Sequence, residues 1–270
     1  MTAMFRDKVV VVTGAASGIG RATTAAFVDR GAKVWACDVD EAGLGRLEDQ
    51  HAGRVHVHRA DVSRKDDVRA FRDVVERAEP AVDVLVNNAG VGLAGDIRTT
   101  TLEDWEWIVG VNLWGVIHGC HYFLPRMIDA RAGHVVNVSS VLGYVGAPDV
   151  LAYSTTKFAV FGLSESLRAE LSRHDVGVSV ICPGIVNTNI VKTTRYRMKD
   201  PDGMKRRIVG LYDRRNYKPE GVAKAIVDAV QHKRDVVPVT PEAWALYYTK
   251  RLSPRLSRAL GQRGARRSLG

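Results

Sequence analysis

Short apolar runs recur along the chain and predict seven β-strands. Most of these runs are apolar at nearly every position and do not alternate with polar residues. Such runs are typical of parallel strands that are covered by helices on both faces. The predicted strands are Val9–Val12, Lys33–Cys37, Arg54–His58, Val82–Val86, His134–Val138, Val176–Ile181 and Val236–Val239.

Segments with helical character lie between the strands and give a repeated strand–helix–strand pattern. In such repeats the crossovers are right-handed and the ligand lies at the carboxyl ends of the strands. The sequence therefore predicts an α/β, single-domain Rossmann fold, a doubly wound parallel sheet of about seven strands with helices on both faces. The clearest helices are Gly20–Arg30, Arg64–Ala78, Leu102–Met127 and Leu151–Arg173.

The length and composition fit one large domain with a short tail. A chain of 270 residues with 46% hydrophobic residues is typical of a globular protein with one core. We expect the domain to span residues 1–242 and a basic amphipathic tail to span 243–270. The chain has no run of 18 apolar residues, and its charged start, Met1–Lys8, does not resemble an export signal. We expect a cytoplasmic protein, with membrane association as the alternative.

The net charge of +9 is concentrated in two segments. Residues 187–218 contain ten Lys and Arg against three Asp and Glu, and residues 243–270 contain seven against none. Because the rest of the chain is slightly acidic, we expect no nucleic-acid-binding body. We also expect no metal site, since Cys37, Cys120 and Cys182 have no metal-binding spacing.

A glycine-rich turn directly after the first strand predicts a dinucleotide site. Three glycines in the segment 13–20 let the backbone approach a pyrophosphate and direct the following helix N-terminus at it. Asp38 ends the second strand, where such folds place the acid that binds the adenosine ribose. A 2′-phosphate ~4 to 5 Å from this carboxylate would cost on the order of 3 to 4 kcal/mol per charge pair. The sequence therefore favours NAD over NADP.

Tyr153 and Lys157 lie one turn apart on a predicted helix and are candidates for proton transfer. A cation beside a phenol stabilises the phenolate and lowers its pKa toward neutral pH. Ser140 ends the strand that carries Asn137, so it lies at the same edge of the sheet as the dinucleotide site. Together these residues place a candidate proton carrier on the same side of the sheet as the dinucleotide site.

These motifs resemble those of the short-chain dehydrogenase/reductase (SDR) family, in its compact single-domain branch. The resemblance covers about residues 6–240 and is carried by several elements in the family order. They are Thr13-Gly-x-x-x-Gly-x-Gly, Asp61-Val62, Asn87-Asn-Ala-Gly, Asn112, Ser140, Tyr153-x-x-x-Lys157, Pro183-Gly184 and Thr188. It implies an NAD-dependent oxidoreductase that interconverts a secondary alcohol and a ketone by hydride transfer.

The resemblance also implies a role for each matching residue. Tyr153 would be the general acid/base, Lys157 would lower its pKa and hold the nicotinamide ribose, Ser140 would bind the substrate oxygen, and Asn112 would support a proton relay. A homodimer or homotetramer is implied as well. The residues expected to bind the cofactor are Gly14, Ser17, Gly18, Ile19, Gly20, Asp38, Asp61, Val62, Asn88, Ala89, Gly90, Tyr153, Lys157, Pro183, Val186 and Thr188.

The two basic segments leave alternatives open. In the family, the segment at 187–218 covers the substrate; its apolar residues favour a lipophilic alcohol or ketone, whereas its cations admit an acyl-CoA or a solvated flap. The tail 243–270 fits peripheral contact with a membrane, docking on a partner subunit, or packing on its own domain. A catalytically silent NAD-sensing or scaffold protein is the alternative from another class.

Overall fold

A central sheet of seven parallel strands organises the computed structural model, which describes residues 4–259. The strand order β3-β2-β1-β4-β6-β7-β9 reverses direction at β1, as in a doubly wound fold. Each strand coincides with one of the seven predicted from its apolar run, so this part of the prediction is confirmed. The strands are β1 Val9–Thr13, β2 Lys33–Asp38, β3 Val55–Arg59, β4 Val84–Asn87, β6 His134–Val138, β7 Gly177–Cys182 and β9 Val236–Pro238.

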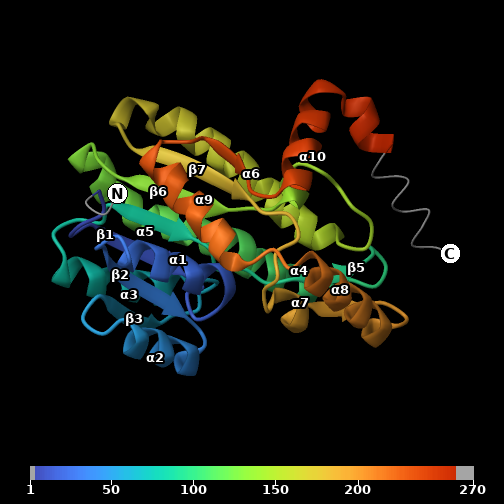
Figure 1. Ribbon diagram of the computed structural model, residues 1–270, viewed down its shortest axis with the longest axis horizontal. Helices are drawn as coiled ribbons and strands as arrows, with labels where there is room; N and C mark the ends of the chain where they lie inside the picture. Colours follow the sequence, from blue (N-terminus) through green and yellow to red (C-terminus); the bar gives the residue numbers. More distant parts are fainter. Residues whose placement is uncertain (1–3, 260–270) are drawn as a thin grey trace.

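Helices cover both faces of this sheet (Figure 1). Val10 and Val12 pack on one face with residues of three helices, and Val9 and Val11 pack on the other face with residues of three more. Burial of successive residues on opposite faces explains why the strand is apolar throughout. The first three helices are α1 Gly18–Val28, α2 Glu41–Gln50 and α9 Pro219–Gln231; the other three are α3 Lys65–Ala78, α5 Gly115–Ala130 and α6 Leu151–Leu171.

The predicted helix Leu102–Met127 is not a uniform α-helix. It comprises α4 Leu102–Val109, a π-helical turn η1 Gly110–Trp114 and then α5. A π turn widens the hydrogen-bonding pattern locally and is often found at functional sites. Here it contains Asn112, one of the residues predicted to take part in proton transfer.

Two further parts lie outside the main sheet (Figure 1). The segment 187–218, hereafter the lid, contains α7 Ile190–Thr193, β8 Arg195–Arg197 and α8 Pro201–Arg215. β8 pairs in parallel with β5 Leu93–Gly95 to form a separate two-stranded sheet. Helix α10 Pro241–Leu252 begins the predicted tail and stands at one corner of the molecule (Figure 1).

Candidate active site

The glycine-rich loop after β1 leaves no room for side chains. Gly14 has a φ of +66°, and a Cβ there would lie 2.6 Å from Ala89 Cα. A Cβ on Gly20 would lie 2.0 Å from Gly14 O. Asn88 holds this loop because its Nδ2 donates to Thr13 O at 2.9 Å and to Gly14 O at 3.0 Å. The loop backbone is therefore fixed as an open cradle at the carboxyl edge of β1 and β4.

The N-terminal end of α1 opens onto this cradle. Ser17 is the N-cap residue, but its side chain makes no capping hydrogen bond within residues 4–259, and no acidic residue lies in the first turn. Uncapped N–H groups at a helix N-terminus are a ready site for a phosphate. Thr188, from the lid, lies close by: its Cγ2 would be 3.4 Å from a Cβ on Gly18. Ile19 follows in the helix and packs against the core below the loop.

Asp38 at the end of β2 binds the same loop. Its Oδ2 accepts from Ala16 N at 2.9 Å, and its Oδ1 accepts from Val39 N and Asp40 N at 2.7 and 3.1 Å. Oδ2 accepts only one hydrogen bond and so retains further acceptor capacity. The residues around the cradle therefore fit a dinucleotide, with donors for a pyrophosphate at α1 and an acceptor for ribose hydroxyls at β2.

The residues predicted to lie beside an adenine follow β3. Asp61 Oδ1 accepts from Ser63 N at 2.9 Å and from Ser63 Oγ at 2.7 Å, which fixes the turn. Val62 is buried, and its side chain contacts α5, where a Cβ on Gly115 would lie 2.7 Å from Val62 Cγ2. Any contact of Val62 with a ligand would therefore be through its backbone.

Asn112 and Lys157 converge on Gly90 from different helices. A Cβ on Gly90 would lie 3.3 Å from Asn112 Oδ1 and 3.4 Å from Lys157 Nζ. The amide of Asn112 is buried; it accepts from Val91 N at 2.8 Å and donates to Thr156 Oγ1 at 3.2 Å. The π turn thus places a fully buried amide between the loop after β4 and helix α6.

Lys157 is held in a single orientation under Tyr153. Its Nζ donates to Val138 O at 3.1 Å and lies 5.7 Å from the centroid of the Tyr153 ring. Burial lowers the pKa of Lys157 from 10.5 to about 8, so the ammonium form still predominates at neutral pH. A buried cation that retains its charge is therefore present next to the phenol.

The pKa of the Tyr153 phenol differs from the sequence-based expectation. Burial raises this pKa above its ordinary value, the neighbouring Tyr212 of the lid raises it further, and a hydrogen bond with the Ser140 side chain lowers it. The sequence predicts that the Lys157 cation lowers this pKa, and that role of Lys157 stays a prediction. Desolvation disfavours the phenolate more than the nearby groups stabilise it. Ser140 Oγ also accepts from Leu142 N at 3.1 Å, which fixes its orientation.

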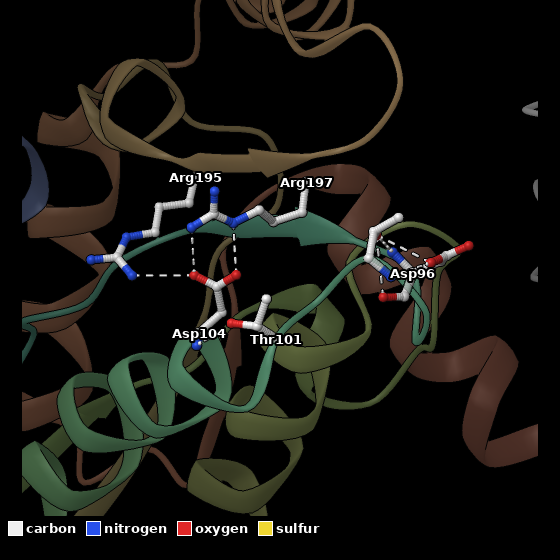
Figure 2. Close-up of polar contacts among 6 residues, drawn as sticks. Asp96, Thr101, Asp104, Arg195 and Arg197 are labelled. Atoms are coloured by element: carbon white, nitrogen blue, oxygen red, sulfur yellow. Dashed lines mark hydrogen bonds and ion pairs between the residues drawn. The ribbon is translucent and has the colours of Figure 1, made fainter.

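The lid is attached to the domain by a buried carboxylate. Asp104, in the first turn of α4, is 1% exposed. Its oxygens accept from Arg197 Nε at 2.7 Å and Nη2 at 2.9 Å, and from Arg195 Nη1 at 3.2 Å (Figure 2). The Arg195 guanidinium also lies 3.6 Å from the centroid of the Trp107 ring. We call Asp104, Trp107, Arg195 and Arg197 the lid clamp.

A second ion pair attaches the other end of the lid. Arg215, the last residue of α8, pairs with Glu242 in the first turn of α10. The same carboxylate accepts from Ile185 N at 3.4 Å. Pro183, in the same loop, accepts a hydrogen bond from Val141 N at 2.8 Å, and Val186 is buried in the core. The loop after β7 is therefore held between the Ser140 turn, the lid and the tail helix.

Comparison with known proteins places this arrangement in a family. The sequence pattern of the family described as short chain dehydrogenase matches residues 8–199. The chain belongs to the short-chain dehydrogenase family. This confirms the predicted resemblance.

Individual relatives cover the chain to different extents. "Probable oxidoreductase EphD" of Mycobacterium tuberculosis is 40% identical over 264 residues, which cover 94% of this chain and 45% of EphD. This chain therefore spans less than half the length of EphD. The 3-oxoacyl-(acyl-carrier-protein) reductase FabG of Thermotoga maritima is 33% identical over 82% of this chain and 89% of FabG. A short-chain dehydrogenase/reductase of Burkholderia phymatum, solved in complex with NAD, superposes with a TM-score of 0.87 at 32% identity, covering 93% and 95% of the two chains.

The fold of this short-chain dehydrogenase brings nearly all the predicted site residues to one edge of the sheet. Asn112, Lys157 and Gly90 meet directly, as do Ser140 and Tyr153. Sequence reasoning missed Thr13 and Thr156 as site residues and missed the lid clamp entirely. Thr13 Oγ1 accepts from Asn88 N and Ala89 N, both at 3.1 Å. Its position before the first glycine was the signal that could have identified it.

No metal centre is built into the described part of the chain. Among residues 4–259, no three His, Cys, Asp or Glu side chains are grouped so that they could hold a metal ion. In the same residues, no helix is both long and apolar enough to cross a membrane.

Proposed function

We propose that this protein interconverts a lipophilic secondary alcohol and the corresponding ketone with NAD, using Tyr153 as the general acid/base. The observation that carries the proposal is the convergence of Ser140, Tyr153, Lys157 and Asn112 beside the glycine cradle. Ser140 follows the end of β6, Asn112 lies in the π turn η1, and Tyr153 and Lys157 lie one turn apart in α6. Their meeting at the carboxyl edge is the arrangement that this chemistry requires.

The cradle residues support the choice of NAD. The first turn of α1, with Gly14, Ser17 and Gly18, would hold the pyrophosphate, and Asp38 would accept the ribose hydroxyls. A 2′-phosphate would be repelled by the Asp38 carboxylate. Arg59 would not offset this repulsion, because its guanidinium pairs with Glu41 at 3.3 Å. When bound, the nicotinamide supplies the hydride chemistry.

The proton is handled by the chain's own residues. In the oxidative direction the Tyr153 phenolate takes the proton of the substrate hydroxyl, and in the reductive direction the phenol returns it. Lys157 keeps a positive charge below the phenol, and Ser140 orients the substrate oxygen. The buried Asn112 amide is hydrogen-bonded to the backbone of Val91. From this position it would support a proton relay through Lys157.

The lid supports a lipophilic substrate over an acyl-CoA. Arg195 and Arg197 are bound by Asp104, and Arg215 is bound by Glu242. These three cations are therefore unavailable to a diphosphate, and Tyr212 lies near enough to Tyr153 to raise its pKa. The other seven Lys and Arg residues of the lid have no ion pair within residues 4–259. A second proposal, an NAD-binding protein without turnover, is disfavoured by the intact Ser140, Tyr153 and Lys157.

The decisive experiment is the substitution Tyr153→Phe. We expect turnover of secondary alcohols, followed by NADH formation, to fall at least a thousandfold, because the proton acceptor is removed. NAD binding, measured by calorimetry, should stay within about tenfold, because the ring and the cradle remain. Tyr122→Phe, on α5, is the matched control and should retain wild-type turnover.

Two results would contradict the proposal. Turnover of Tyr153→Phe within tenfold of the wild type would exclude Tyr153 as the acid/base. Binding of NAD by the wild type without turnover of any steroid, retinoid, fatty or acyl-CoA alcohol would favour the silent sensor. Parallel assays with NADP test the role of Asp38.

A further inference from the structure

Helix α10 is attached to the domain along one side. Ala243 is fully buried, and its carbonyl accepts a hydrogen bond from Tyr144 Oη at 2.6 Å. The Tyr247 ring packs edge-on against the Tyr144 ring, with centroids 5.4 Å apart. Leu246 joins the same apolar cluster. The orientation of α10 is therefore set by its contacts with the turn that follows Ser140.

Another side of α10 presents apolar side chains to solvent. Trp244, Tyr248 and Leu252 are spaced four residues apart and so follow one side of the helix. The Trp244 and Tyr248 rings stack with centroids 5.7 Å apart. Tyr248 is 53% exposed and Leu252 is 81% exposed. We call these three residues the apolar stripe.

A hollow of about 600 Å³ lies beside this stripe, and its charged lining consists of four cations and two acids, Glu165 and Asp235. Its wall includes Trp244 and Tyr248 together with Arg168, Lys233, Arg234 and Arg251. Figure 1 places α10 at a corner of the molecule.

The three arginines of the hollow are each paired with an acid, whereas Lys233 is not. Arg168 pairs with Asp235, Arg234 with Asp228 and Arg251 with Glu165. The ion pairs of residues 4–259 include none for Lys233.

The rest of the tail adds positive charge without any acid. Lys250, Arg255 and Arg258 have no ion-pair partner within the described residues. Residues 243–270 contain seven Lys and Arg and no Asp or Glu. This end of the molecule therefore combines exposed aromatic and aliphatic side chains with an excess of cations.

We propose that this corner of the molecule binds the surface of an anionic phospholipid membrane. Trp and Tyr rings are favoured at the level of the headgroups, and Leu252 would enter the edge of the acyl region. Lys233 and the tail cations would face the lipid phosphates, and each cation near an anionic surface contributes about fivefold to binding. The proposal is independent of the catalytic one, because none of these residues lies at the cradle.

Vesicle co-sedimentation with the complete 270-residue chain tests the proposal. Vesicles of phosphatidylcholine with 30% phosphatidylserine should carry down most of the protein, and vesicles of phosphatidylcholine alone should carry down at least tenfold less. Raising NaCl from 0.05 to 0.5 M should weaken binding at least tenfold, since exposed charges are screened. Equal binding to both vesicle types, or none to either, would overturn the proposal.

Exposed-residue variants locate the surface without disturbing the fold. Tyr248→Ser with Leu252→Ser should reduce binding at least tenfold, because the inserting area is lost. Lys233→Gln should reduce binding about fivefold. The matched controls are Ile97→Ser, which removes an exposed aliphatic side chain elsewhere, and Arg77→Gln, which removes an unpaired exposed cation of α3. Equal effects of variants and controls would refute the assigned surface.

Two further measurements distinguish insertion of the apolar stripe into a membrane from its contact with a second copy of this chain. Brominated acyl chains should quench part of the tryptophan fluorescence, and Trp244→Phe should abolish that quenching. Unchanged quenching in Trp244→Phe would contradict insertion. If Tyr248→Ser with Leu252→Ser instead lowers the molecular mass in analytical ultracentrifugation, the stripe contacts a second copy of this chain and the membrane proposal fails.

Discussion

The lid and the tail carry the same net charge of +7, but their ion pairs differ in how deeply the acidic partner is buried. In the lid, Arg195 and Arg197 bind the buried Asp104, and Arg215 binds Glu242. In the described part of the tail, Arg251 is the only cation with an acidic partner, Glu165, and that pair is half-exposed. Three of the ten lid cations and one of the four described tail cations therefore have an acidic partner, and only the lid has a partner that is fully buried, Asp104.

This difference shows that composition alone does not define what a basic segment does. Charge-assisted hydrogen bonds to a buried carboxylate have strong geometric preferences and fix the partner in place. Exposed ion pairs contribute little because water and salt screen them. The lid arginines Arg195 and Arg197 thus fix β8 against α4, whereas Lys250, Arg255 and Arg258 have no ion pair within residues 4–259.

Among the changes that test this difference between lid and tail, removal of the Asp104 carboxylate should have the largest effect. Asp104→Asn leaves two guanidinium groups without their acceptor, and its amide would direct a donor toward one of them. We expect unfolding free energy in urea to fall by about 2 kcal/mol, since the arginines are half-exposed. Hydrogen exchange across 187–218 should accelerate, and the KM for an alcohol substrate should rise more than kcat falls.

The matched control breaks the corresponding pair of the tail. Glu165→Gln removes the acid that pairs with Arg251, and it should change the unfolding free energy by no more than about 0.5 kcal/mol. If the two substitutions have equal effects, burial of the carboxylate does not distinguish lid from tail, and the comparison fails.

Lowering the pH should protonate Asp104 and loosen the lid, with a smaller effect than the substitution has. The hydrogen bonds from Arg197 lower the pKa of Asp104 below its ordinary value of 3.8. A carboxyl group with a lowered pKa stabilises the folded state above 3.8, and this stabilisation is lost as the pH falls through the folded-state pKa. Lid hydrogen exchange, corrected for intrinsic rates, should therefore be constant from pH 7 to 5 and accelerate below about 3.8.

The same titration in Asp104→Asn serves as its reference. That variant lacks the titrating group, so its lid should exchange rapidly at every pH. An acceleration in the wild type between pH 7 and 5 would point to another group, because Asp104 stays ionised over that range.

The strands of the sheet could be predicted because each one is a contiguous run of residues in the sequence. Most strands, such as β1, are apolar on both faces and buried throughout, whereas β3 alternates Val and His and is only partly buried. Tyr153 and Lys157 could be paired in advance because helical spacing alone places them together. Asn112 was predicted to act at the site, but nothing in its neighbours indicates the π turn that positions it.

The lid clamp could not be predicted because its partners are distant in sequence. Asp104 lies 91 residues before Arg195 and 93 before Arg197. The raised pKa of Tyr153 has a similar origin, because it depends on burial and on Tyr212, which lies 59 residues further along the chain. Helices α8 and α10 were also missed, because few of their side chains are buried and the apolar period is weak.

Among the contacts of the lid clamp, the stacking of Arg195 on Trp107 should make the smallest measurable contribution to the unfolding free energy. Arg195→Lys keeps the charge near Asp104 but loses the planar group that lies 3.6 Å from the ring centroid. We expect a loss of about 1 kcal/mol in unfolding free energy, whereas Arg258→Lys in the tail should change it by less than ~0.3 kcal/mol. A double-mutant cycle with Trp107→Leu isolates the contact, because Arg197 and Asp104 stay unchanged in all four proteins. A coupling energy near zero would mean that the hydrogen bond to Asp104 alone holds Arg195, and that Trp107 only covers the ion pair from solvent.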